Sequence, residues 1–280
     1  ERIQFLDQVI QKAIAVDLDV ILDFHPNPQY THQLIANGQA AEKYLRLWGQ
    51  IADHYGAMNP DRIVLEVMNE ISVNDLYSWS GLLQQSIQVI RHHAPNSTIL
   101  VQGAGYSDIW DLVELPVLPD ANLIYDFHYY EPHIFTHQGA TWGLDYWLDV
   151  RNLPFPATEK GVSEVIEHTD SVETRWRLLQ YKEDHWDADR IASDIEFAAK
   201  WAHERNVPLM CDDLSCAMSS ASTATSPCRR IAGVGSLRPA PLSRRTTSAG
   251  PCGITKADSA WSTRRTAVCA MTTWFCAAWG

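Results

Sequence analysis

Short apolar segments alternate with longer helical ones over residues 1–210, and this alternation constrains the fold more than any other feature. Five segments rich in Val, Ile and Leu are predicted as strands: 17–25, 61–70, 97–103, 121–130 and 207–211. Apolar residues recur at helical spacing in the segments between them: 1–16, 40–55, 74–93 and 187–205. Asn74 is the expected cap of the helix at 74–93. Continuous apolar strands between helices predict a parallel sheet buried on both faces.

Two fold classes fit this alternation, a doubly wound open sheet and an eight-stranded (β/α) barrel. No glycine-rich phosphate loop follows any of the predicted strands, which counts against a nucleotide-binding sheet. The 280 residues are enough for one large domain with a sizeable core. No apolar run reaches about 18 residues, so no transmembrane helix is predicted.

Charge is distributed unevenly along the chain. Residues 1–210 carry 14 Lys and Arg against 31 Asp and Glu, whereas residues 211–280 carry 8 against 3. An acidic body argues against nucleic acid as a partner. We expect a monomer that needs no metal or cofactor and does not bind a membrane.

Chemically useful side chains stand where the predicted strands end. His25 ends the first strand, Asn69 and Glu70 end the second, and His128 and Tyr130 end the fourth. In parallel barrels the carboxyl ends of the strands build the active site. A carboxylate at the end of a largely apolar strand needs a partner or a task, so Glu70 is the first candidate for chemistry. A salt-bridged glutamate and hydrogen-bonded structural histidines are the alternatives.

Several of these segments resemble one family. "VILDFHP", "RIVLEVMNE", "LIYDFHYYEP" and "NVPLMCDD" resemble the third, fourth, sixth and seventh strands of glycoside hydrolase family 5, the cellulase-like retaining glycosidases. The resemblance covers roughly residues 1–213. It implies a (β/α)8 TIM barrel that is incomplete, with strands 3 to 7 present and strands 1, 2 and 8 missing. We expect this partial barrel over residues 1–212, with a long insertion at 131–186.

The resemblance also implies a role for each strand-end residue. Glu70 would act as general acid and then as base, and Asn69 would bond the sugar 2-hydroxyl. His128 and Tyr130 would support the nucleophile and the sugar subsite. His25 would contact the sugar next to the cleaved bond.

Position 213 departs from the family pattern, which has Glu followed by Phe where this chain has Asp213 and Leu214. A retaining glycosidase needs its two carboxyls about 5–5.5 Å apart. Asp withdraws its carboxylate by roughly 1–1.5 Å relative to Glu, and a misplacement of about 1 Å costs about a hundredfold in rate. Trp142, in the insertion, is a candidate platform for a sugar ring, and a tryptophan that only anchors the loop is the alternative.

Composition changes abruptly after residue 210. Residues 211–280 hold 12 Ala, 10 Ser, 9 Thr, 7 Arg and all 6 Cys, with no Glu, Asn, Gln, His or Tyr. Three disulfides or a disordered tail would be conventional interpretations. The missing residue types, however, all have A as their second codon base, which is the bias that out-of-frame translation of GC-rich DNA produces.

The tail can be tested against the genetic code. Back-translation of residues 219–280, read from the third base of each codon with synonyms chosen freely, can encode "IGWTMWDYKGGFG", which resembles the family's eighth strand. Loss of one base from codons for Asp-Glu-Phe-Val gives the observed "DDLS" at 212–215. We therefore interpret 213–280 as an out-of-frame tail rather than a domain. The chain as written is expected to fold poorly and to be inactive.

The predicted function is an endo-acting glycoside hydrolase that cleaves a β-1,4-linked glucan by a retaining double displacement. A secreted or periplasmic location is expected, with the signal region outside this chain. One alternative is a non-catalytic carbohydrate-binding pseudoenzyme. Another is a metal-dependent barrel hydrolase that uses Asp23, His25 and His128, although no strand carries a His-x-His pair.

Overall fold

The computed structural model describes residues 2–214 and the backbone of residues 265–272. These residues form two compact units. The first unit comprises residues 2–127, 202–210 and 265–272, and the second comprises residues 128–201 and 211–214. Most of the tail interpreted as out of frame, 213–280, therefore lies outside the described residues.

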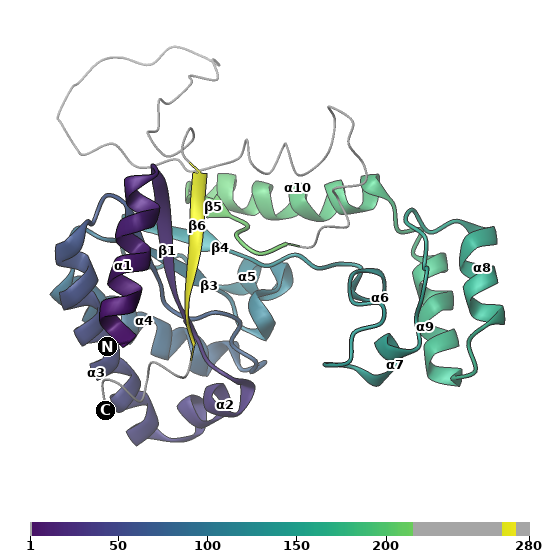
Figure 1. Cartoon of the computed structure of the whole chain (residues 1–280), viewed down its shortest axis with the longest axis horizontal. Helices are drawn as coiled ribbons and strands as arrows, with labels where there is room; N and C mark the ends of the chain where they lie inside the picture. Colours follow the sequence, from purple (N-terminus) through teal and green to yellow (C-terminus); the bar gives the residue numbers. More distant parts are fainter. Residues whose placement is uncertain (1, 215–264, 273–280) are drawn as a thin grey trace, which may run out of the picture. The chain divides into compact units, whose positions relative to one another are not determined.

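A six-stranded parallel sheet is the centre of the first unit (Figure 1). Its strands are β1 (Leu18–His25), β2 (Ile63–Glu66), β3 (Thr98–Gln102), β4 (Leu123–Asp126), β5 (Leu209–Met210) and β6 (Arg265–Thr272). Across the sheet they are ordered β5-β4-β3-β2-β1-β6. The first five follow one another without a reversal, whereas a doubly wound sheet reverses at a switch point. This order is that of a partial (β/α)8 barrel.

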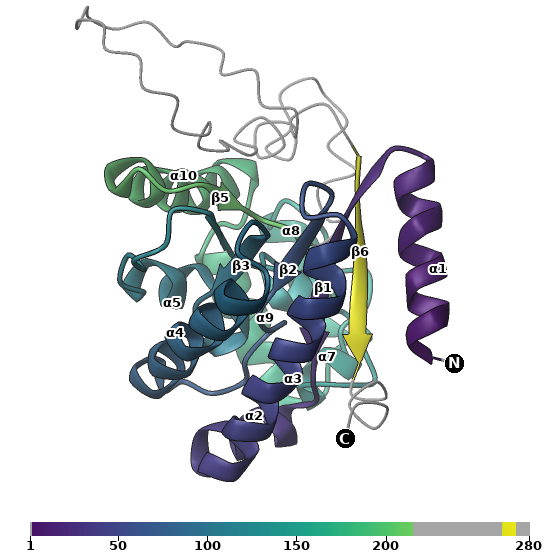
Figure 2. The same ribbon diagram turned by 90° about the vertical axis from the view of Figure 1, so that its left-hand side faces the viewer.

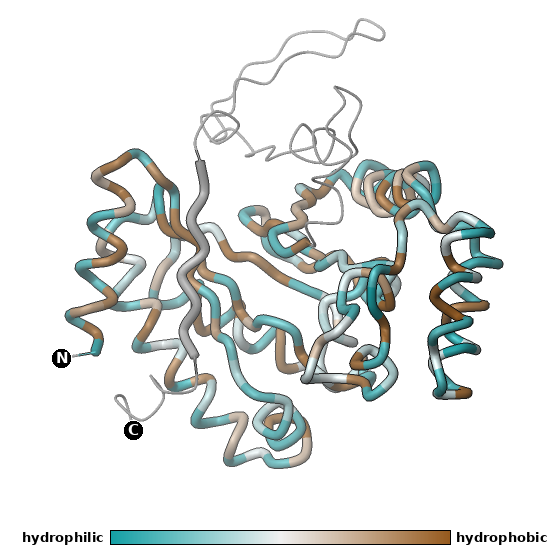
Figure 3. The backbone as a smooth tube through the Cα atoms, turned by 45° about the vertical axis from the view of Figure 1, so that its right-hand side comes forward, coloured by the Kyte–Doolittle hydropathy of each residue, from teal (hydrophilic) through white to brown (hydrophobic). Residues whose placement is uncertain are grey.

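Helices connect the strands of the first unit. They are α1 (Arg2–Ala15), α2 (Pro28–Ala36), α3 (Gly38–Met58), α4 (Leu76–His93), the short 3-10 turn η1 (Gly105–Ser107) and α5 (Ile109–Glu114). The helix that starts at the marked N-terminus alternates between brown and teal in Figure 3, as expected for an amphipathic helix. The cap of α4 is Asp75 and not the predicted Asn74, because the Asp75 carboxylate accepts from the Ser78 amide at 3.0 Å.

The core of the first unit runs across the strands and under the helices. Ile21, Val64, Leu100 and Ile124, one from each of β1 to β4, pack together and are at most 7% exposed. The predicted apolar strands are thus buried as expected for a sheet covered on both faces.

Arg62 links the start of β2 to the start of β1. Its guanidinium pairs with Asp17 at 3.2 Å and with the buried carboxylate of Asp19. These three residues lie at the amino ends of the strands, opposite the carboxyl ends that carry the predicted site.

Each of the five predicted strands is shorter than expected, and in two of them the difference falls at the end that carries site residues. β2 ends at Glu66 rather than at Glu70, and β4 ends at Asp126 rather than at Tyr130. Glu70 has a φ of 46°, a left-handed backbone conformation that a strand does not contain. The Asn-Glu pair therefore lies on a loop that follows the strand.

The β6 strand was not expected, because strand signals fail in the tail. Its backbone pairs in parallel with the whole of β1, from Leu18 opposite Arg265 to His25 opposite Thr272. Figures 1 and 2 both show the two strands side by side. A sheet edge offers unpaired N–H and C=O groups to any extended segment, and this main-chain pairing does not require an alternating side-chain pattern.

The second unit contains the predicted insertion, which is largely helical. Its helices are α6 (His133–Thr136), α7 (Asp145–Leu148), α8 (Glu159–Glu167), α9 (Val172–Glu183) and most of α10 (Ala188–Arg205). Side-chain oxygens of Thr158 and Ser171 cap α8 and α9 by accepting from backbone amides of the first turns. Among the described residues, no helix has the length and apolar character needed to cross a membrane.

Candidate active site

His25 and Asn69 meet at the carboxyl ends of β1 and β2. His25 Nδ1 lies 3.1 Å from the carboxylate of Asp23, whose side chain is buried. His25 Nε2 lies 3.4 Å from Asn69 Nδ2. Because an ionised carboxylate only accepts, Nδ1 carries the proton and Nε2 accepts from the asparagine amide. The structure thus brings two predicted site residues together and orients the ring of His25 and the side-chain amide of Asn69.

Glu70 is partly buried on the loop after β2. Its φ of 46° costs free energy for a residue with a side chain, and such positions cluster at active sites. The start of the loop is fixed by two buried donors of α3: the Tyr44 hydroxyl and Trp48 Nε1 both bond the Val67 carbonyl, at 2.8 and 3.1 Å. The main chain that leads to Glu70 is therefore held by the core.

The predicted residues of the second unit also meet. The Tyr130 hydroxyl donates to Asp213 Oδ1 at 2.5 Å. His128 Nδ1 lies 4.0 Å from Asp213 Oδ2, and the Asp213 side chain is 48% exposed. The carboxylate at position 213 is thus oriented by a phenol, faces an imidazole and still reaches solvent.

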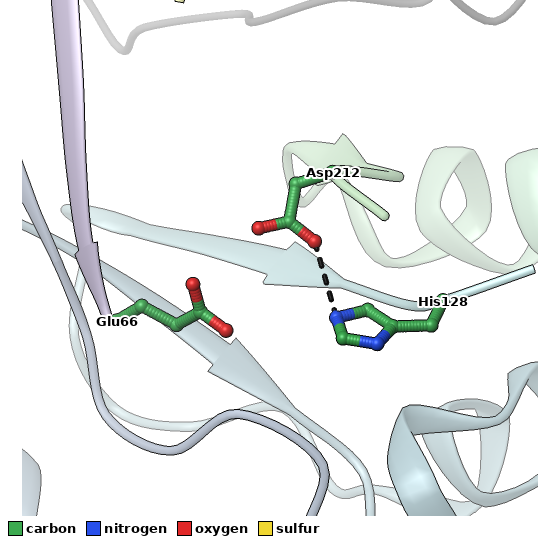
Figure 4. A group of neighbouring side chains, drawn as sticks. All are labelled: Glu66, His128 and Asp212. Carbon is green, nitrogen blue, oxygen red and sulfur yellow. Dashed lines mark ion pairs between the residues drawn. The ribbon is translucent and has the colours of Figure 1, made fainter. Parts of the chain in front are cut away.

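Asp212 is a site residue that the sequence interpretation missed. Its carboxylate lies 3.2 Å from His128 Nε2, and both side chains are almost fully buried (Figure 4). This pair holds the imidazole so that its other nitrogen, Nδ1, faces Asp213. The only sequence signal was the Asp-Asp dipeptide directly after an apolar strand, and the family pattern drew attention to its second member.

A stack of rings begins at Tyr130. The His137 ring lies 5.4 Å from Tyr130 and 4.4 Å from Trp147, with which it is stacked at 23°. Trp142 packs edge-on against both, 5.2 Å from His137 and 5.9 Å from Trp147, and is 65% exposed. Trp142 therefore packs by its edge against this stack and keeps an exposed ring, and its role as a platform for a sugar stays a prediction.

Glu131 pairs with His133 at the base of this stack, with Oε1 3.0 Å from Nδ1. Burial alone would raise the pKa of Glu131. Hydrogen bonding and the positive charge of His133, with a contribution from His137, outweigh that effect and hold the pKa of this carboxyl below its ordinary value.

Comparison with known proteins now identifies the family. A family model described as "Cellulase (glycosyl hydrolase family 5)" matches residues 1–228. The chain belongs to glycosyl hydrolase family 5. This confirms the resemblance, and it favours a glycosidase over the metal-dependent barrel hydrolase.

The relatives of this family-5 chain are longer than the segment that matches it. Endoglucanase C of Acetivibrio thermocellus is 22% identical over 217 residues, which cover 75% of this chain and 62% of the relative. Cellodextrinase A of Ruminococcus flavefaciens is 32% identical over 149 residues, which cover 50% and 44%. Thermotoga maritima Cel5A, solved with a mannotriose substrate, is 25% identical with a TM-score of 0.56, over 75% of this chain and 59% of that one. The family-5 chain thus spans about three fifths of the length of Endoglucanase C. The likeness to Cel5A over 75% of the chain confirms the expected (β/α)8 barrel as a partial one.

Proposed function

We propose that this family-5 chain carries the machinery of an endo-acting β-1,4-glucan hydrolase that works by a retaining double displacement. The observation that carries the proposal is the hydrogen bond from Tyr130 to Asp213, 2.5 Å long. The phenol donor fixes the direction of one carboxylate oxygen, and an attacking nucleophile must be held in such a defined orientation. The similarity to Endoglucanase C supports a glucan as the substrate class.

The proposed reaction divides the work between two carboxyls. Glu70 protonates the departing glycosidic oxygen while the carboxylate at position 213 attacks the anomeric carbon, which forms a glycosyl-enzyme. Glu70 then takes a proton from water, and that water releases the sugar. Asn69 has a second amide proton for the sugar 2-hydroxyl, because the first faces His25.

His25, His128 and Trp142 complete the proposed site. The His25 side chain is 46% exposed and is available to the sugar beside the cleaved bond. His128 faces the carboxylate at the nucleophile position through Nδ1. Trp142 offers its ring to a sugar face. The two-carboxyl chemistry requires no metal or cofactor, so a chelator is expected to leave it unchanged.

Asp213 limits this chain. Its carboxylate is withdrawn by roughly 1–1.5 Å relative to glutamate, so we expect turnover at least about a hundredfold below that of a chain with Glu there. The sequence predicts a chain that folds poorly and is inactive, and this shortening together with the incomplete barrel is the reason for that prediction.

The test is restoration. Reducing ends released from a soluble β-1,4-glucan are measured for the chain as it stands and for Asp213→Glu, with a soluble β-mannan in parallel. We expect Asp213→Glu to raise hydrolysis of the glucan about a hundredfold, and Glu70→Gln in that background to abolish it. Glucan binding without hydrolysis in Asp213→Glu would reject the proposal in favour of the carbohydrate-binding pseudoenzyme. Preference for the mannan would correct the substrate.

A polymeric glucan cannot cross a cell membrane, so we propose that the enzyme works outside the cytoplasm, as a secreted or periplasmic protein. The proposed site draws on one chain, and we propose a monomer. Size-exclusion chromatography with light scattering tests this assembly state.

A further inference from the structure

Gln102, on β3, has a buried side chain whose amide is committed at both ends. Its Nε2 donates to Glu66 Oε1 on β2 at 2.7 Å and to Asp126 Oδ2 on β4 at 3.0 Å. Its carbonyl oxygen accepts from the Ser107 hydroxyl at 2.5 Å. The two carboxylates accept the amide protons, so the amide cannot flip and its oxygen must face Ser107. Gln102 thus links three strands to the turn that follows β3.

That turn has an unusual backbone. Gly105, Tyr106 and Ser107 are all left-handed, with φ values of 56°, 64° and 62°. Successive left-handed residues with side chains cost free energy, and they persist only where the surroundings hold them. The Ser107 hydroxyl bond to Gln102 is one such constraint, and Ser107 itself is fully buried.

The same turn binds the loop that carries Glu70. The Tyr106 amide donates to the carbonyl of Ile71, the residue after Glu70, at 2.9 Å. The Gly105 amide donates to the Val73 carbonyl at 3.1 Å. In this left-handed turn the neighbouring amides of Gly105 and Tyr106 meet carbonyls of the loop that are two residues apart. The turn therefore restrains the main chain directly after Glu70.

The loop is fixed on its other sides as well. The backbone amide of Asn69, the residue before Glu70, donates to the Phe24 carbonyl of β1 at 2.9 Å. The Ser72 hydroxyl lies 2.5 Å from the Thr31 hydroxyl of α2. Glu70 keeps its own left-handed conformation between these restraints, and the turn at 105–107 supplies those nearest to it on the C-terminal side.

The geometry points to Gln102 and Ser107 as positioning residues for Glu70, acting through the left-handed turn at 105–107. The inference rests on the proposed role of Glu70 as acid and base. Neither side chain needs to touch the sugar. Their task is to keep the Glu70 carboxyl where it can protonate the departing oxygen, a task for which about 1 Å matters.

The test separates acid placement from general damage by the leaving group. Departure of a sugar hydroxyl needs the proton of Glu70, whereas dinitrophenolate departs without it. In the Asp213→Glu background, Ser107→Gly and Gln102→Leu are compared with their parent on cellotetraose and on dinitrophenyl β-cellobioside. We expect kcat/KM to fall roughly 10- to 100-fold for cellotetraose and less than about threefold for the aryl glycoside. Ser107→Gly removes the hydroxymethyl side chain and adopts the left-handed backbone without strain, which protects folding.

Thr98→Val is the matched control. Thr98 is also buried, and its hydroxyl donates to Asn122 Oδ1 at 3.2 Å at the amino end of β3, the end opposite Gln102. It should leave the ratio of the two substrates unchanged. Equal losses on both substrates in Ser107→Gly would overturn the inference, because a loosened fold impairs both reactions alike.

Hydrogen exchange gives a readout that needs no turnover. Amides of residues 71–75 should exchange about tenfold faster in Ser107→Gly than in the parent, while those of α3 keep their rates. Unchanged exchange at 71–75 would overturn the inference. If the Asp213→Glu parent hydrolyses neither substrate, the proposed function fails, and the exchange experiment still decides whether the turn restrains the loop.

Discussion

The two proposed catalytic carboxyls are held in different ways. The restraints described around Glu70 act on the main chain, through backbone bonds to Phe24 and to the turn at 105–107. At Asp213 the main-chain carbonyl accepts from the Tyr129 amide at 3.0 Å, and the side chain is held in addition by the Tyr130 hydroxyl and faces the His128 imidazole. Main-chain restraint fixes where a side chain starts, whereas side-chain restraint fixes where its carboxylate ends. The two sites should therefore respond differently to changes in length, backbone and neighbours.

The largest effect is expected from shortening Glu70. Glu70→Asp in the Asp213→Glu background withdraws the acid by one methylene, and the restrained main chain cannot follow it. We expect kcat/KM on a soluble glucan to fall about a hundredfold. Full activity in this variant would mean that another group donates the proton.

The next prediction concerns the backbone of the left-handed turn at 105–107, which restrains the loop that carries Glu70. Gly105→Ala places a methyl group against the Asp111 carboxylate at a φ of 56°, and we expect it to lower the free energy of unfolding by about 2 kcal/mol. Urea unfolding followed by circular dichroism measures the change. Gly81→Ala, in helix α4 with open space around its Cβ position, is the control and should stabilise the protein by about 0.5–1 kcal/mol. A loss in Gly81→Ala as large as that in Gly105→Ala would remove the special role of the turn.

Removal of a hydroxyl tests the side-chain restraint. Tyr130→Phe deletes the donor to position 213, and we expect roughly a tenfold loss of kcat in the Asp213→Glu background. Tyr129→Phe deletes the neighbouring phenol, which bonds Asp194 at 2.8 Å, and should reduce stability with little change in kcat. An equal loss of kcat in Tyr130→Phe and Tyr129→Phe would contradict a specific role of the Tyr130 hydroxyl at position 213.

The smallest effect concerns pH and Glu131. The pKa of this carboxyl is lowered in the folded state, so its ionisation stabilises the fold above its ordinary pKa. That stabilisation is lost as pH falls through the lowered value. Glu131→Gln should therefore lower Tm slightly at pH 7, and the difference should vanish toward pH 3. The side chains of Glu131 and His133 are both partly exposed to solvent, so added salt should reduce this stabilisation. A difference that grew in acid would contradict the sign.

Much of the fold could be predicted because its signals are local. Buried strands such as Leu18–His25 and Thr98–Gln102 have apolar runs at their centres, and helical spacing marks α3 and α10. The strand-end residues followed from a rule of topology, since the carboxyl ends of parallel strands share one edge. The pairs formed by His25 with Asn69 and by Tyr130 with Asp213 agree with that grouping within each unit.

The rest depends on tertiary restraint. Glu70, Tyr106 and Ser107 take left-handed conformations that local preference assigns to glycine, so no pattern in the sequence marks them. Asp212 escaped notice because its importance comes from an ion pair with a residue 84 positions earlier. β6 forms by main-chain pairing along β1, which side-chain periodicity does not report. These features share one cause, the energy of contacts between residues distant in sequence.

The Arg62 cluster with Asp17 and Asp19 has a practical consequence. It sits at the strand starts, while every proposed reacting group follows a strand end. The amino ends of the strands can therefore be stabilised without changing the carboxyl ends, for example by adding charge pairs or shortening connections beside Arg62. Heat tolerance and catalytic tuning become separate design problems, each with its own set of positions to vary.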